Sequence, residues 1–155
     1  MAKFTVGSGI DQYIRQLTNL EFESEEMVKR AVYEGAKIVA NAIKGNINSL
    51  SVGSGQGQLT AAQKEGLQRG MGISHMENRS GSINVKIGFA GRNTQVTRAT
   101  YPRGQYNTTV ARALESGTST MRKQPFVNAA VMRSRAAAEQ AMAKMIDEEI
   151  GKRMH

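Results

Sequence analysis

Residue types that commonly carry catalysis or bind metal ions are few in this sequence, and they are far apart. The only histidines are His75, which falls in an expected strand, and His155. A catalytic triad needs a nucleophile, a base and an orienting group within hydrogen-bond reach, so two histidines placed like this are a poor start for one. The sequence has no cysteine, which excludes thiol catalysis and thiolate metal ligands. We therefore predict no catalytic residue, no metal site and no cofactor, and we expect a protein that is not an enzyme.

The carboxylates and glycines also lack the spacing that catalysis or phosphate binding requires. Acidic residues cluster at positions 25–26, in the expected first turn of one helix, and at positions 147–149, along another, where exposure to solvent explains them. The GSGQG stretch at positions 53–57 lacks the G-x-G-x-x-G spacing of a dinucleotide-binding loop, and no parallel-sheet pattern surrounds it. We interpret residues 50–58 as a flexible Gly/Ser-rich loop. Its candidate contact residues are Val52, Gly53, Gly55 and Gly57.

The charge of the chain indicates a binding function. The formal net charge is +8 and the pI is near 10.0, which favours a polyanionic or acidic partner. The charge is unevenly distributed, since residues 78–138 hold ten basic residues and a single acid, Glu115, whereas residues 11–34 hold six acids and three basic residues. Such polarity lets copies of one chain attract one another, or lets one face of the molecule meet a charged partner.

Nucleic-acid binding is the second interpretation of the basic charge. Aromatic residues make up only 5% of the chain and tryptophan is absent, whereas stacking platforms for single strands need aromatics interleaved with cations. The stretch Tyr101-Pro102-Arg103 and the nearby Tyr106 are a sparse version of that pattern. No helix-turn-helix or zinc-finger spacing is present. Non-specific contact with DNA phosphates therefore stays open, but no motif in the sequence indicates sequence-specific recognition of bases.

The first half of the chain is predicted to be mainly helical. Apolar residues at helical spacing predict a short helix over residues 9–20, after a short strand at residues 4–6. Ser24 is a suitable N-cap for a long amphipathic helix over residues 24–48, and two glutamates follow it where the helix dipole favours acids. A further short helix is expected within residues 59–72. The buried stripe of the long helix is expected to include Val28, Val32, Val39, Ile43 and Ile47.

Residues 82–89 form the clearest strand in the sequence. Apolar residues alternate there with polar or small ones, which is the period of a half-buried antiparallel strand. A weaker strand at residues 73–77 and turn-forming residues 78–81 precede it, so we predict a β-hairpin over about residues 73–89. A lone hairpin is marginally stable in water, so helices or strands of another chain must cover its apolar face. The inward residues of the clear strand are Ile83, Val85, Ile87 and Phe89.

Residues 91–107 are predicted to form a second flexible loop, which is long, polar and basic. Loops longer than about 12–15 residues are uncommon in compact domains and are usually functional or disordered. Together with a basic pair in a later linker, this loop supplies candidate contacts to another subunit or to a partner. These candidates are Arg92, Arg98, Tyr101, Arg103, Tyr106, Arg122 and Lys123.

Two helices follow, joined by a corner whose geometry the sequence restricts. We predict a short helix over residues 107–116 and a long one over residues 125–153. Gly117 suits a left-handed C-cap, and Pro125 suits the first helical position because its missing N–H would be unsatisfied there anyway. The expected buried stripe of the long helix is Val127, Val131, Ala138, Met142, Met145 or Ile146, and Ile150.

These elements predict one α+β domain over residues 1–155. A small antiparallel sheet, built from the hairpin and edge strands, is expected to pack against the two long helices. A chain of 155 residues lies within the usual size of a single domain, about 100–200 residues. No apolar run approaches the roughly 18 residues that span a bilayer, and the first residues lack a signal-peptide core. We therefore expect a soluble, unexported chain with no membrane partner.

One ordered set of residues in the second half of the chain has a familiar form. Glu115-Ser116-Gly117-Thr118-Ser119 is followed by Pro125-Phe126 and an alanine-bearing helix. An acid, one residue, Gly-Thr-Ser and then Pro-Phe opening the last helix resembles a family of tail-component proteins of long-tailed bacteriophages. Members are variously described as tail completion, tail-to-head joining or tail terminator proteins. The stretch 101–105 with Asn107, and the strand at residues 83–89, are similar to the version in phages and prophages of Gram-positive bacteria. The N-terminal half agrees in layout only.

The resemblance implies a non-enzymatic structural protein of the virion. Its small α+β fold would assemble into a ring, with six copies, at the head-proximal end of the phage tail, completing the tail and joining it to the head. The implied partners are other copies of the chain, the tail tube protein and a head-side connector or stopper protein. The implied location is the tail or neck of the virion, and the host cytoplasm during assembly. Tail terminator and head-side joining protein both stay open, because both need the same small ring-forming domain. The motif residues at the helix corner are Glu115, Gly117, Thr118, Ser119, Pro125 and Phe126.

Overall fold

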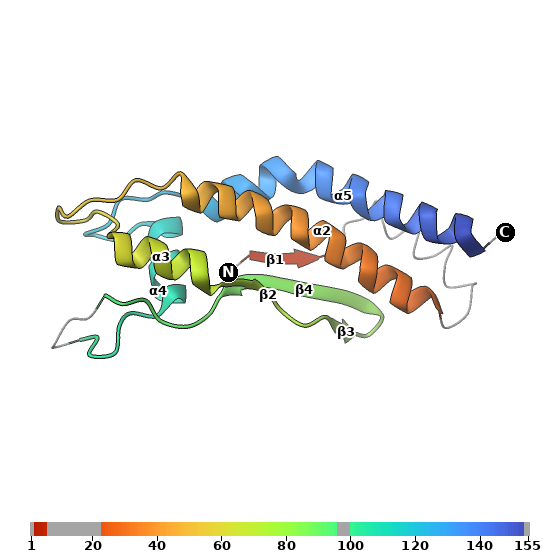
Figure 1. Ribbon diagram of the computed structural model, residues 1–155, viewed down its shortest axis with the longest axis horizontal. Helices are drawn as coiled ribbons and strands as arrows, with labels where there is room; N and C mark the ends of the chain where they lie inside the picture. Colours follow the sequence, from red (N-terminus) through yellow and green to blue (C-terminus); the bar gives the residue numbers. More distant parts are fainter. Residues whose placement is uncertain (1, 6–22, 96–99, 154–155) are drawn as a thin grey trace.

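The computed structural model describes residues 2–5, 23–95 and 100–153 (Figure 1). The helix expected over residues 9–20 lies outside these ranges, and so does Arg98. The fold is α+β, as predicted, with a small antiparallel sheet packed against two long helices. The strands are β1 (Ala2–Thr5), β2 (Met71–Ile73), β3 (Glu77–Arg79) and β4 (Ser82–Phe89). The helices are α2 (Glu23–Asn48), α3 (Ala61–Gly70), α4 (Asn107–Ser116) and α5 (Phe126–Arg153).

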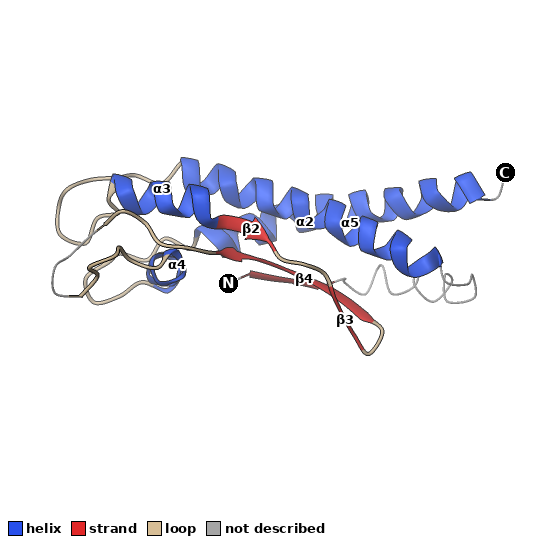
Figure 2. Cartoon of the chain, turned by 60° about the horizontal axis from the view of Figure 1, so that its bottom comes forward, coloured by secondary structure: helices blue, strands red, loops and turns tan. Residues whose placement is uncertain are grey.

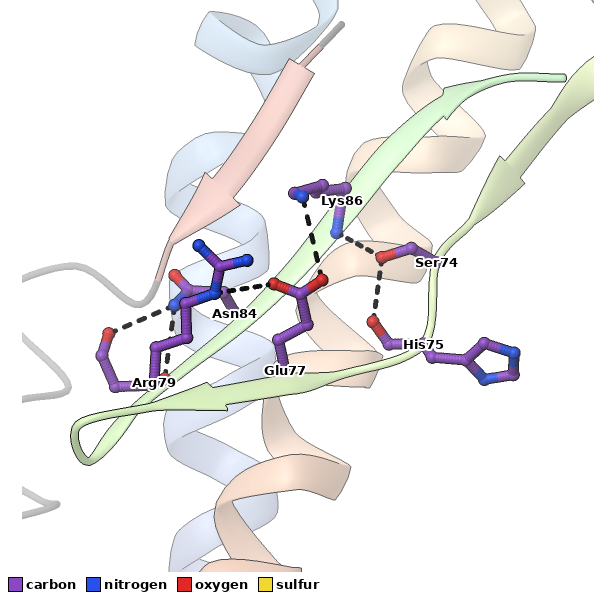
Figure 3. Close-up of polar contacts among 7 residues, drawn as sticks. Ser74, His75, Glu77, Arg79, Asn84 and Lys86 are labelled. Atoms are coloured by element: carbon purple, nitrogen blue, oxygen red, sulfur yellow. Dashed lines mark hydrogen bonds and ion pairs between the residues drawn. The ribbon is translucent and has the colours of Figure 1, made fainter.

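Strand β4 is the centre of the sheet. It pairs antiparallel with β1 on one side, where Phe4 faces Val85, and with β2 and then β3 on the other side. Its apolar residues at every second position are buried beneath the helices, as the alternation in the sequence predicts. The opposite face of β4 is polar, and there Glu77 of β3 forms ion pairs with Arg79 (3.2 Å) and Lys86 (3.8 Å) (Figure 3).

The predicted hairpin is interrupted, because its first strand contains a bulge. Ile73 faces Ile87 and Glu77 faces Asn84, so residues 74–76 lie opposite only two residues of β4. Ser74 closes the bulge with its side chain, since its Oγ accepts a hydrogen bond from the Lys86 backbone N–H (2.9 Å; Figure 3).

The predicted turn at residues 78–81 is shorter than expected. Asn78 and Arg79 belong to β3, and only Ser80 and Gly81 form the turn, with φ angles of 53° and 81°. Two consecutive positive φ values fit a two-residue type I′ turn, whose twist matches that of the flanking strands.

Two long helices run antiparallel along the molecule and cover one face of the sheet (Figures 1 and 2). Helix α5 buries every fourth residue from its first, namely Phe126, Ala130, Ser134, Ala138, Met142 and Ile146. The sequence predicted most of the second half of this row, from Ala138 onward. In the first half it favoured Val127 and Val131, which are only half-buried. After Phe126 the row continues with the small residues Ala130 and Ser134, and rows at four-residue spacing on two helices pack as ridges in grooves.

Gly35 lies at a close contact between the two long helices. A Cβ at this position would lie 2.7 Å from Sδ and 2.8 Å from Cγ of Met142, a side chain with no exposed surface. Gly45, nearly three turns further along α2, would have nothing within 4 Å of its Cβ. The glycine at position 35 is therefore required by packing, whereas the glycine at position 45 only weakens the helix.

These two glycines give a matched pair of stability tests. We expect Gly45→Ala to stabilise the protein by about 0.5–1 kcal/mol, because alanine loses less backbone entropy in a helix. The same change at Gly35 should destabilise it by about 1–2 kcal/mol, because overpacking exceeds the gain in propensity. Urea unfolding of both variants measures the difference. Equal effects of the two changes would show that α2 and α5 do not pack at this distance.

The hairpin is joined to α2 by a polar contact that predicts a pH dependence. Hydrogen bonds from Lys29 and, to a lesser degree, Asn78 lower the pKa of the Glu25 carboxyl below its ordinary value. A lowered pKa means that this contact stabilises the fold above the ordinary glutamate pKa and is lost as pH falls through the folded-state pKa. We expect Lys29→Met to raise the Glu25 pKa, measured by NMR titration of the carboxyl carbon. Lys144→Met is the control and should leave it unchanged.

Candidate functional site

Three connecting segments gather at one end of the molecule, which we call the loop end (Figures 1 and 2). It comprises the described parts of residues 49–60, 90–106 and 117–125. The first two segments meet where the Thr60 hydroxyl donates to Gln95 Oε1 at 3.0 Å. The first and third are in contact because a Cβ at Gly57 would lie 2.2 Å from the carbonyl oxygen of Thr120. All sequence-predicted contact residues within the described chain belong to these segments.

Glu115 holds the corner between α4 and α5. The carbonyl of Pro125 accepts the first hydrogen bond of α5, from the Ala129 N–H, so Pro125 is the N-cap. The sequence predicted it at the first helical position, which Phe126 occupies instead. Proline has no side-chain acceptor for the free N–H groups of the first turn. Glu115 supplies it, because its Oε2 accepts from the Val127 N–H (2.9 Å) and its Oε1 from the Asn128 N–H (2.8 Å). A carboxylate at this place also interacts favourably with the helix dipole.

The linker between the two helices is folded back on itself. Gly117 has a φ of 74°, and its N–H donates to the Ala113 carbonyl, which ends α4. Thr118 Oγ1 then accepts from the Met121 N–H at 2.8 Å, and the Thr118 N–H donates to the Met121 carbonyl. Ser119 is exposed and no contact explains its place in the motif. The Gly-Thr part of the motif therefore has a local structural role: it reverses the chain so that Glu115 reaches α5.

Phe126 connects the corner to the rest of the fold. Its ring is buried and packs against Phe89 at the end of β4, with ring centroids 6.0 Å apart. Its carbonyl accepts a hydrogen bond from Nδ2 of Asn46, near the end of α2, at 2.9 Å. Residues of the motif therefore contact α2, β4, α4 and α5. Sequence analysis missed Asn46, because nothing in a helical pattern marks one asparagine as a link to a distant helix.

Side-chain amides hold the second predicted loop against α3. Asn93 Oδ1 accepts from the N–H groups of Gln95 (2.9 Å) and Gln105 (3.2 Å), which draws the two sides of the loop together. Gln63 of α3 donates from Nε2 to Gln105 Oε1 at 2.8 Å. Asn107 is buried and donates to the Ala90 carbonyl. The sequence pattern signals none of these contacts, although the spacing of Thr60 and Gln63 at the start of α3 is that of a capping box.

Arg92 and Tyr106 form an exposed pair at the base of this loop. Their backbones form an antiparallel bridge, the guanidinium lies 4.1 Å from the ring centroid, and Nη2 donates to the tyrosine hydroxyl. Tyr101 also has a partner, so it is not a free aromatic group. In the first loop, the backbone groups of Gly53 and Gly55 form hydrogen bonds that hold the loop in shape. Val52 in the same loop is 49% exposed.

Cations without a partner are concentrated at the loop end. Of the basic residues whose side chains are described, five form no hydrogen bond or ion pair with another described residue: Lys44, Arg103, Arg112, Arg122 and Lys123. The last four are exposed and lie in the loop end or on the adjoining α4. The acids nearby, Glu65 and Glu115, are engaged with Arg69 and with α5. The loop end is therefore a surface of uncompensated positive charge on a tightly bonded frame.

Within the described ranges, no three histidine or acidic side chains come together as a metal site, and no helix is long and apolar enough to cross a membrane. No family model, no curated protein and no solved structure gives a significant match to this chain.

Removing the Glu115 carboxylate tests the corner. We expect Glu115→Ala to destabilise the protein by about 1–2 kcal/mol, because two N–H groups of α5 and its dipole lose their acceptor. Hydrogen exchange at Val127 and Asn128 should accelerate more than exchange in the middle of α5. Glu139→Ala is the control, since it removes only an exposed pair with Arg135 worth about 0.5 kcal/mol or less. Unchanged exchange at the two amides would contradict the capping role.

Proposed function

We propose that this protein is a structural component of a bacteriophage tail, forming a ring of six copies at the head-proximal end that completes the tail and joins it to the head. In this role it acts by shape and assembly, without a chemical step. Its partners are other copies of itself, the tail tube protein and a head-side connector or stopper protein. It acts in the tail or neck of the virion and is assembled in the host cytoplasm.

The main support for this proposal is that the motif residues lie together in the folded chain. Residues of the Glu-x-Gly-Thr-Ser and Pro-Phe pattern lie in different elements, and they meet in one corner where Glu115 caps α5 and Phe126 packs on Phe89. The resemblance to tail-component proteins therefore rests on residues that determine how the chain turns. A pattern of exposed residues alone would be weaker support.

The distribution of rigidity and charge also supports an assembly role. The two long helices and the sheet give an elongated body, and the three loops are all at one end of it (Figure 1). Loops held on a rigid frame are well suited to contact a neighbouring subunit or ring. Unpaired cations such as Arg122 and Lys123 lie at that end, whereas acidic residues 147–149 lie near the other end of α5. Such polarity orients neighbouring copies or components relative to one another.

Non-specific binding of DNA phosphates is the second candidate function. The specific observation in its favour is the group of exposed, unpartnered cations at the loop end, with the Arg92–Tyr106 pair beside them. Phosphate contacts release counterions, so binding of this kind weakens with salt at a log–log slope of about −0.9 for each phosphate neutralised on duplex DNA. An assembly held by apolar helix faces depends much less on salt.

Native mass spectrometry over a range of concentrations, supported by negative-stain images, tests the proposal directly. A discrete hexameric ring that persists as salt rises is the expected result. A monomer at every concentration that binds duplex DNA with a steep salt dependence would replace the ring proposal with the second candidate.

Charge reversal at the loop end tests which surface makes the assembly contacts. We expect Arg122→Glu/Lys123→Glu to raise the concentration needed for half-assembly about tenfold or more, a change of roughly 1.4 kcal/mol. The control is Lys144→Glu/Lys152→Glu, which has the same charge change towards the other end of α5 and should not weaken assembly. Equal loss of assembly in both variants would indicate a general effect of net charge, and the loop end would not be the contact surface.

A further inference from the structure

An open groove runs between α2 and the edge of the sheet. Its accessible volume is about 330 Å³, and it is bounded by one side of α2 and by the whole of β2. Tyr33, Lys37, Asn41 and Lys44 line its helical side, at spacings of four, four and three residues that place them on one face of α2. The groove is on the side of α2 away from α5, so it is separate from the interface of the two long helices.

The wall opposite α2 is a sheet edge with unused backbone groups. Strand β2 pairs with β4 on one side, and among the described strands none pairs with its other side. Ser74 N–H donates to Lys86 and Ala90 N–H donates to Gly70, so residues 70, 72 and 74 direct their backbone groups towards β4. Because backbone groups alternate along an antiparallel strand, the N–H and C=O of Ile73 point outward into the groove.

The charge of the groove is positive. Lys44 is exposed and is the single unpartnered cation outside the loop end and α4, among the basic residues whose side chains are described. Lys37 pairs with Glu34 of the preceding turn at 2.6 Å, and its Nζ lies over the Tyr33 ring, 5.5 Å from the ring centroid. Among the residues that the structure describes, no acidic one lines the groove. Its apolar surface comes from Met71, from Ile73 and from the ring of Tyr33, which is 44% exposed.

We propose that this groove binds an extended acidic segment of a partner protein, which adds to the edge of β2 as a further strand. Main-chain hydrogen bonds to Ile73 would give the segment its direction, as in other complexes formed by strand addition. Alternate side chains of the segment face α2, where carboxylates meet Lys37 and Lys44. These two lysines are seven residues apart, about 10.5 Å along the helix, a span that acids on one face of a strand can reach.

A short peptide of alternating Val and Glu is the probe for this site. Fluorescence anisotropy of the labelled peptide, titrated with the full chain, measures the dissociation constant. We expect Lys44→Glu to weaken binding at least about fivefold, because an attraction becomes a repulsion. The same variant should bind the matching Val–Lys peptide more tightly than the wild type does. Arg112→Glu is the control, because it reverses another exposed and unpartnered cation, on α4 and outside the three segments of the loop end.

Peptides methylated at backbone nitrogens separate strand addition from simple charge attraction, and they leave the protein unaltered. Methylation of the alternate amides that face β2 should abolish binding, whereas methylation of the other set should change it less than twofold. The proposal is overturned if the wild type does not bind the peptide at millimolar concentration, or if Arg112→Glu weakens binding as much as Lys44→Glu. It is also overturned if both methylated peptides bind like the parent, since charge alone would then explain the interaction. None of these results depends on whether the protein forms a ring.

Discussion

The close packing of α2 against α5 is the constraint on which the rest of the structure depends. Both helices bury rows of residues at four-residue spacing, and at Gly35 the backbone of α2 lies against Met142 with no room for a Cβ. This packing makes one wide apolar surface from two helices. That surface covers the inner side of a sheet too small to be stable alone. The elongated body then fixes where the connecting segments must lie, which is at its ends (Figure 1).

At the loop end, electrostatics and packing act together. Glu115 is the only acid among ten basic residues over positions 78–138, yet it is not a counter-ion to any of those that the structure describes. It caps α5 instead, which leaves the nearby cations without a partner and keeps the local surface positive. Phe126 links this corner to α2, because its carbonyl accepts a hydrogen bond from Asn46, and to β4, because its ring packs against Phe89. The arrangement combines a fixed backbone with unsatisfied charge, and this combination is what an assembly surface requires.

The sequence predicted most of the elements because their signals are local. The periodicity of α2 and β4 and the Gly117 and Pro125 boundaries of the helix corner all act within a few positions. Ser24, expected as the N-cap of the first long helix, instead lies inside α2, which begins at Glu23. The hairpin was predicted with the wrong detail, because the bulge at residues 74–76 depends on pairing with β4 and on the hydroxyl of Ser74. The stripe of α5 was partly misplaced as well, since the small residues Ala130 and Ser134 are buried in the fold although their residue types do not mark them as core.

The sequence by itself determined the class of fold, the order of its elements, the uneven charge and the motif that resembles phage tail components. Only the tertiary structure decided which residues meet. Glu115 reaches Val127, Gln63 reaches Gln105 and Asn46 reaches Phe126 across 12, 42 and 80 positions. The free edge of β2 beside Lys44 likewise exists only in the folded chain. The physical reason is that propensity and periodicity act over neighbouring residues, whereas contacts between distant segments are chosen by packing of the whole core.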